Sequence, residues 1–170
     1  MTSLATPKKK LQAAKAIPEL VSTAVQRGFS GYVLDYEPHA NLTSAHAHAL
    51  GAWLKGLATA LHASKKQLAV CVSDWGIIGP TYYSVLAAAG ADRYVSMGST
   101  YGNVKNPAIK MNVEAMLLAF PQETITVGIG TIVPAACNCV FGNWGNCTGN
   151  YGWTEDTLST FVHWVASKGQ

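Results

Sequence analysis

The apolar residues of this chain recur at two spacings, and the two alternate along the sequence. Apolar residues three and four positions apart predict helices over 11–27, 44–64, 82–89 and 113–120, and a closing helix from Thr154 onward. The buried stripe expected for the second helix consists of Leu50, Trp53, Leu54, Leu57 and Leu61, and Gly28 is the expected end of the first.

Short uncharged runs between these helices predict strands at Tyr32–Leu34 and over 67–72, 93–97 and 124–132. The first run has no internal polar residue, so we expect a strand buried on both faces, as in parallel sheets. Strands that alternate with helices predict an α/β fold with a parallel sheet. No linker divides residues 1–170, which we therefore expect to form one domain with a Cys-, Gly- and Asn-rich loop at 135–152.

Two carboxylates follow the first predicted strand. Side chains alternate along extended backbone, so Asp35 and Glu37 should face one way and Tyr36 the other. Burying two carboxylates is costly unless they are hydrogen-bonded or solvated in a cleft, and such a pair can supply a proton donor. The alternative is that both acids simply enter a solvated loop before Pro38.

Other polar side chains also follow predicted strands. Asp74 and Trp75 come after the second strand, and Tyr101 and Asn103 come after the third. The carboxyl ends of parallel strands share one edge, where ligands bind in α/β folds. These residues are therefore candidates for the same site as the acid pair.

The composition narrows the class of protein. Hydrophobic residues make up 49% of the chain and charged residues 12%, which indicates a packed domain rather than a disordered segment. The net charge of +3 comes partly from Lys8 to Lys10, with no further basic stripe, so we expect no nucleic-acid partner. No apolar run is long enough to cross a bilayer, and we expect no membrane partner.

Cysteines and glycosylation acceptors indicate the compartment. Cys137, Cys139 and Cys147 cluster in the loop at 135–152, and Asn41 and Asn146 begin Asn-x-Thr acceptor triplets. We therefore expect a secreted glycoprotein whose leader is absent from this chain. A disulfide from Cys147 to Cys137 or to Cys139 is expected, with the pairing left open, and Cys71 is expected to be a buried thiol.

The residues from Phe29 to Glu37 resemble the fourth-strand signature of the family 18 glycoside hydrolases, the chitinase-like (β/α)8 barrels, which ends in Asp-aromatic-Glu. The resemblance implies that Glu37 is the general acid and that Asp35 orients the N-acetyl group of the substrate, which acts as the nucleophile. The run from Met97 to Tyr101 is similar to the sixth-strand motif, so Tyr101 would hydrogen-bond that N-acetyl group. Asp74, Trp75, Met97 and Asn103 are then expected to contact the sugar.

The resemblance implies no cofactor. His39, His46 and His48 lack the spacing of a metal site, and no metal is expected. Two departures from the family pattern matter. Val33 stands where the signature usually has a further acid, and a complete barrel needs about 250 residues and eight strands. We therefore expect a partial (β/α)8 barrel with four strands, a fragment that is either a weakened hydrolase or a non-catalytic sugar-binding relative.

Overall fold

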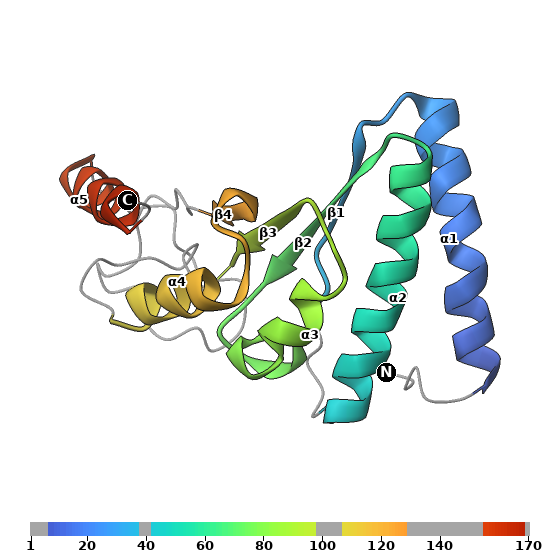
Figure 1. Ribbon diagram of the computed structural model, residues 1–170, viewed down its shortest axis with the longest axis horizontal. Coiled ribbons are helices and arrows are strands. Elements are labelled where there is room, and N and C mark those ends of the chain that lie inside the picture. The colour runs from blue at the N-terminus through green and yellow to red at the C-terminus, as the bar shows by residue number, and fades with distance from the viewer. Residues whose placement is uncertain (1–6, 38–41, 98–106, 129–154, 169–170) are drawn as a thin grey trace, which may run out of the picture.

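The computed structural model describes residues 7–37, 42–97, 107–128 and 155–168, shown in colour in Figure 1. Four parallel strands form one sheet in the order β1 (Gly31–Leu34), β2 (Gln67–Val72), β3 (Arg93–Ser96) and β4 (Ile125–Val127). The helices are α1 (Pro7–Arg27), α2 (Ser44–Ala63), α3 (Tyr83–Ala87), α4 (Pro107–Ala119) and α5 (Glu155–Ser167), with 3-10 turns over 76–78, 80–82 and 122–124. The predicted α/β fold with four parallel strands is confirmed.

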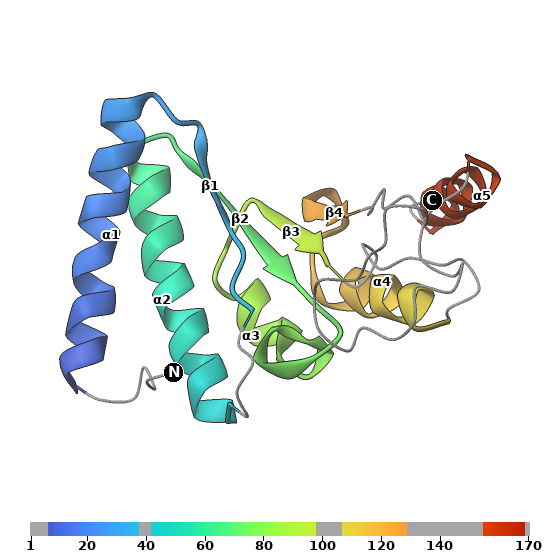
Figure 2. The same ribbon diagram turned by 180° about the vertical axis from the view of Figure 1, so that it is seen from behind.

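One face of the sheet carries the main hydrophobic core. Alternate residues of β2, namely Leu68, Val70 and Val72, point to this face and are buried against the apolar stripe of α2. The helices α1 and α2 lie side by side, with α2 next to the sheet (Figures 1 and 2). The stripe predicted for α2 is confirmed for its four leucines, which are all buried, whereas its fifth member, Trp53, is only partly buried.

No helix of the described part of the chain covers the opposite face of the sheet, which we call the open face. Val33 of β1 is 67% exposed, and Arg93 of β3 and Thr126 of β4 on the same face are exposed as well. The prediction that the first strand is buried on both faces is therefore wrong. The described helices cover the face that carries Tyr32 and Leu34, and both of these side chains pack on the main core.

The connection between α1 and β1 depends on two glycines. Gly28, the predicted end of the helix, has a φ of 70°, and the following amide of Phe29 bonds back to the carbonyl of Ala24 at 2.9 Å. At Gly31 a Cβ atom would collide with the carbonyl oxygen of Gln67, so only glycine lets β1 approach β2 this closely.

Several predicted boundaries and faces differ from the structure. Helix α1 begins at Pro7 and continues through Pro18, and α4 begins at Pro107 rather than at residue 113. The start of α4 was missed because Asn112 interrupts its apolar pattern, although this side chain is buried. From the apolar spacing of their helices, Val25 of α1 and Val162 of α5 are predicted on core-facing stripes, but they are 54% and 50% exposed.

A second, smaller core joins α4 and α5. Val113 and Phe161 are buried there, and Trp164 packs against them. The ammonium groups of Lys110 and Lys168 lie 5.3 and 5.5 Å from the centre of the Trp164 ring, so both cations can interact with its π system. This cluster places α5 at the opposite end of the molecule from α1 (Figure 1).

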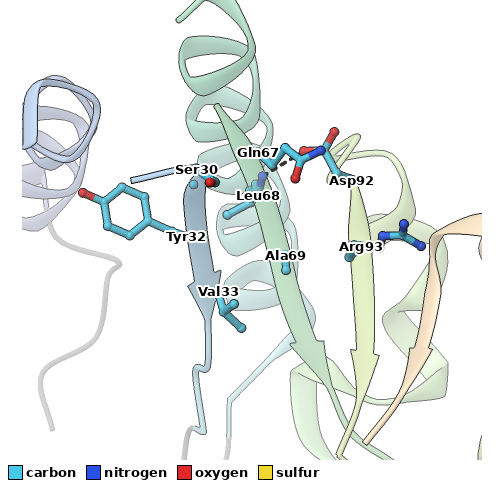
Figure 3. Close-up of a pocket in the computed structure, with 9 residues that line it drawn as sticks. Ser30, Tyr32, Val33, Gln67, Leu68, Ala69, Asp92 and Arg93 are labelled. Atoms are coloured by element: carbon cyan, nitrogen blue, oxygen red, sulfur yellow. Dashed lines mark hydrogen bonds between the residues drawn. The ribbon is translucent and has the colours of Figure 1, made fainter. Parts of the chain in front are cut away.

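Asp92 connects the amino end of β2 to α2 through its side chain. Its carboxylate accepts a hydrogen bond from the amide of Leu68 at 2.8 Å and pairs with Nε2 of His62 at 2.9 Å. Figure 3 shows Asp92 beside a hollow lined by Val33, Ala69 and Arg93. This hollow lies toward the amino ends of β1 and β2, away from the edge where the acid pair emerges.

Asp92 should contribute to stability above pH 4. Burial alone would raise the pKa of its carboxyl, but the hydrogen bonds from Leu68 and His62 outweigh burial, and the pKa lies below its ordinary value of 3.8. The unfolded chain therefore takes up this proton first as the pH falls, so the contribution is full at pH 7 and is lost as the pH drops below 4.

Asp92→Ala should lower the free energy of unfolding at pH 7 by about 1–3 kcal/mol, because the Leu68 amide loses its acceptor. Urea unfolding should show a smaller loss at pH 3 than at pH 7. Asp92→Asn, which keeps an acceptor oxygen, should lose less. Wild-type stability of Asp92→Ala at pH 7 would contradict this role.

Candidate functional site at the carboxyl edge of the sheet

Asp35 and Glu37 lie in the irregular segment that directly follows β1. Asp35 is exposed and Glu37 is half-buried. Tyr36 between them packs against the main core and so points toward the helices. The expected alternation of side chains therefore continues past the end of β1.

Cys71 of β2 lies close to both Asp35 and Glu37, on the open face of the sheet. Leu34 pairs with Val70, so the next pair along the parallel strands brings Asp35 beside Cys71. Burial, and to a lesser extent the negative charges of Asp35 and Glu37, together raise the pKa of the Cys71 thiol to about 11. Both carboxylates are therefore close enough to the buried Cys71 thiol to raise its pKa.

Cys71 was expected to be buried, and this is confirmed, because the side chain is 9% exposed. Its position beneath the acid pair was not predicted. The signal was present in the sequence, since a residue near the end of one parallel strand meets the first residue after its neighbour. It could be used only once the register of β1 against β2 was known.

Ser73, Asp74 and Trp75 form the turn after β2. Ser73 is fully buried, and its hydroxyl lies 3.3 Å from both the Asp74 carboxylate and the Trp75 amide. Asp74 is exposed, whereas Trp75 is half-buried against the main core. Asp74 is therefore presented to solvent at the same edge of the sheet as the acid pair.

Met97 follows β3 and is buried. Its amide donates to the carbonyl of Val72 at 2.7 Å, which places it next to the end of β2. The structure thus brings Asp35, Glu37, Asp74, Trp75 and Met97 to the ends of three neighbouring strands. Tyr101 and Asn103 lie outside the described residues, as do Asn41, Asn146 and the cysteines at 137, 139 and 147.

Of the three histidines weighed for a metal site, His39 lies outside the described residues, His48 is exposed on α2, and His46 bonds locally to Thr43. Nδ1 of His46 lies 2.8 Å from the Thr43 hydroxyl and accepts from the Thr43 amide at 3.2 Å, which closes the start of α2. Within the described ranges, no three His, Cys, Asp or Glu side chains are grouped to hold a metal ion. Nor does any described helix combine the length and apolarity needed to cross a membrane.

The fold is shared with solved chitinase structures. A chitinase from Chromobacterium violaceum matches with a TM-score of 0.57 and 21% identity over 72% of this chain, and a class V chitinase from Pseudomonas fluorescens matches with a TM-score of 0.53 and 23% identity over 72%. A Bacillus subtilis protein designated a sporulation-specific glycosylase matches with a TM-score of 0.59 and 17% identity over 77%. No family model and no curated protein sequence matches the chain.

The chain spans less than half of each of these structures, covering 41%, 41% and 47% of their lengths. Its four parallel strands, with helices on one face and an open second face, are consistent with part of a TIM barrel, in which the second face would line the interior. At these identities the likeness establishes the fold alone. The carboxyl edge that carries Asp35 and Glu37 is the edge where such barrels place their chemistry.

The reactivity of Cys71 should report the acid pair. Iodoacetamide reacts with the thiolate, so a raised pKa slows alkylation at pH 8 to 9. Replacing both acids by amides (Asp35→Asn with Glu37→Gln) removes two negative charges and should speed alkylation of Cys71 by roughly threefold. Mass spectrometry of the Cys71 peptide separates this thiol from the other cysteines.

Glu114→Gln is the matched control, because Glu114 lies on α4 and pairs with Lys168 at 3.0 Å. This variant should leave the alkylation rate of Cys71 unchanged. Equal rates in the wild type and in the Asp35→Asn, Glu37→Gln variant would mean that the acids do not lie near the thiol.

Proposed function

We propose that this chain is part of a glycoside hydrolase of the chitinase type, acting on polymers or glycans that contain β-linked N-acetylglucosamine. One observation carries the proposal. Two carboxylates on one face, above Cys71, follow a strand of a fold shared with chitinases. The carboxyl edge of a parallel barrel is also where catalytic groups gather.

In this proposal Glu37 is the general acid, which gives its proton to the glycosidic oxygen as the bond to the anomeric carbon breaks. The carbonyl oxygen of the substrate's own N-acetyl group attacks that carbon, and Asp35 orients the group and stabilises its positive charge. Water then opens the intermediate, with Glu37 taking back a proton, and the anomeric configuration is retained. The exposure of Asp35 and the half-burial of Glu37 are compatible with these roles.

The sugar would extend along the ends of β2 and β3. Asp74 offers an exposed carboxylate for sugar hydroxyls, and the half-buried Trp75 offers apolar surface. Met97 stays in the proposal by resemblance to the family motif, and its buried side chain lies at the end of the neighbouring strand. We keep Tyr101 and Asn103 in the proposal as further contacts, by resemblance to the family motif. The reaction needs no cofactor and no metal.

A secreted glycoprotein remains part of the proposal. It is supported by the acceptor triplets that begin at Asn41 and Asn146 and by the clustered cysteines, with a disulfide from Cys147 to Cys137 or to Cys139. The partner is a carbohydrate, and neither nucleic acid nor membrane is proposed.

Val33 favours a second candidate function, a sugar-binding protein without turnover. It lies on the open face two residues before Asp35, where the family signature has an acid that helps Asp35 exchange its proton. A protein that lacks this acid can keep a sugar cleft and lose catalysis.

Glu37→Gln should abolish turnover of chitin oligosaccharides by the full-length protein, with a loss of at least about 100-fold in kcat. The side-chain volume is kept, so oligosaccharide affinity should stay within about threefold of the wild type. Product release measured by chromatography, together with calorimetric binding, checks both. Equal rates for wild type and Glu37→Gln would sink the catalytic assignment, and binding without turnover in both proteins would favour the second candidate.

Val33→Asp should raise kcat of a weakened hydrolase by about tenfold or more, because it returns a proton partner to Asp35. Val33 is exposed, so the fold should tolerate the change. Val33→Asn is the neutral control and should leave kcat unchanged. A wild type that turns over substrate and gains nothing from Val33→Asp would show that this relay does not limit the rate.

A further inference from the structure

A chain of buried polar side chains lies directly beneath the turn that carries Asp74. The hydroxyl of Ser96 donates to Oδ1 of Asn112 at 2.9 Å, and Nδ2 of Asn112 donates to the hydroxyl of Tyr83 at 2.7 Å. The Tyr83 hydroxyl in turn donates to the carbonyl of Ser73 at 2.5 Å. All four residues are at most 2% exposed, and they come from β3, α4, α3 and the end of β2.

Ser73 needs this support because it lies just past the sheet. The pairing of β2 with β3 ends at Val72, so the Ser73 carbonyl has no strand partner and would be costly to bury alone. Its amide donates to the carbonyl of Ile78 at 3.0 Å, which closes the turn from below. Ser73 is thus held by its amide and its carbonyl, and its hydroxyl meets Asp74 and Trp75.

We propose that Tyr83 and Asn112 are positioning residues of the candidate site: through Ser73 they fix the Asp74–Trp75 turn in the orientation that meets the sugar. Neither side chain touches the substrate, since both are buried below the edge of the sheet. The inference rests on the proposed function and extends it from the acid pair to the neighbouring subsite.

Electrostatics support the short path from Tyr83 to the site. The pKa of the Tyr83 hydroxyl is raised to about 12, mainly by burial and further by the charge of Asp74, which together outweigh the lowering effect of the hydrogen bond from Asn112. The hydroxyl therefore stays protonated across the working range of pH, as a donor to the Ser73 carbonyl must. Asp74 is close enough for its charge to be felt at Tyr83.

The chain provides a matched control for removing the Tyr83 hydroxyl. Tyr83 and Tyr94 flank the same ring of Phe120, at 5.0 and 4.0 Å between centroids, and both are 1% exposed. The Tyr94 hydroxyl bonds instead to the carbonyls of Leu86 and Ala87, at the far end of α3 from the candidate site. Tyr83→Phe and Tyr94→Phe thus delete the same group from the same core, and only one deletion reaches Ser73.

In the full-length protein, Tyr83→Phe should weaken binding of chitin oligosaccharides by about tenfold, with a matching rise in KM and a smaller change in kcat. Tyr94→Phe should lose stability similarly and keep the wild-type affinity. In an Asp74→Ala background, Tyr83→Phe should cause no further loss of affinity, because it acts through that turn. Equal affinities for the two Phe variants, or additive losses with Asp74→Ala, would overturn the inference.

Amide hydrogen exchange of residues 73–78 separates this inference from the proposed function. Tyr83→Phe should speed exchange in this turn more than Tyr94→Phe does, whether or not the protein acts on chitin. A wild type that neither binds nor cleaves the oligosaccharides would sink the proposed function, and the exchange data would still decide whether Tyr83 holds the turn. Unchanged exchange in Tyr83→Phe would overturn the positioning role.

Discussion

The register between parallel strands is the constraint on which the candidate site depends. Pairing of Leu34 with Val70, and of Val72 with Ser96, decides which residues meet once the strands end. A slip of one residue would turn Asp35 and Cys71 to opposite faces, because side chains alternate. This register requires glycine at position 31, since any larger residue there would push β1 away from Gln67.

Much of the fold follows from local patterns in the sequence. Helix α2 and strand β2 were predicted nearly residue by residue, because each combines a clear apolar period with a clear end. The start of α4 and the exposure of Val33 could not be predicted from such local patterns. Asn112 breaks the apolar period of α4 for a tertiary reason, its bonds to Tyr83 and Ser96, and the exposure of Val33 depends on what covers the sheet.

The candidate site also contains residues that the sequence alone predicts and residues that it does not. Asp35, Glu37 and Asp74 could be found from the sequence because each follows a strand. The residues that surround them, Cys71 below the acids and Tyr83 below the turn, have no local signature, because they reach the site from other elements through strand register and helix packing. Residues that touch a ligand can stand next to one another in the sequence, whereas residues that support them usually do not.

Substitutions on the two faces of the sheet have different consequences for folding. Leu68, Val70 and Tyr94 pack against the helices, whereas Val33, Arg93 and Thr126 lie on the other face and are exposed. A substitution at the second set leaves the helix-facing core intact. Mutational drift can therefore alter the chemistry of the open face, including gain or loss of an acid at Val33, with little penalty to folding.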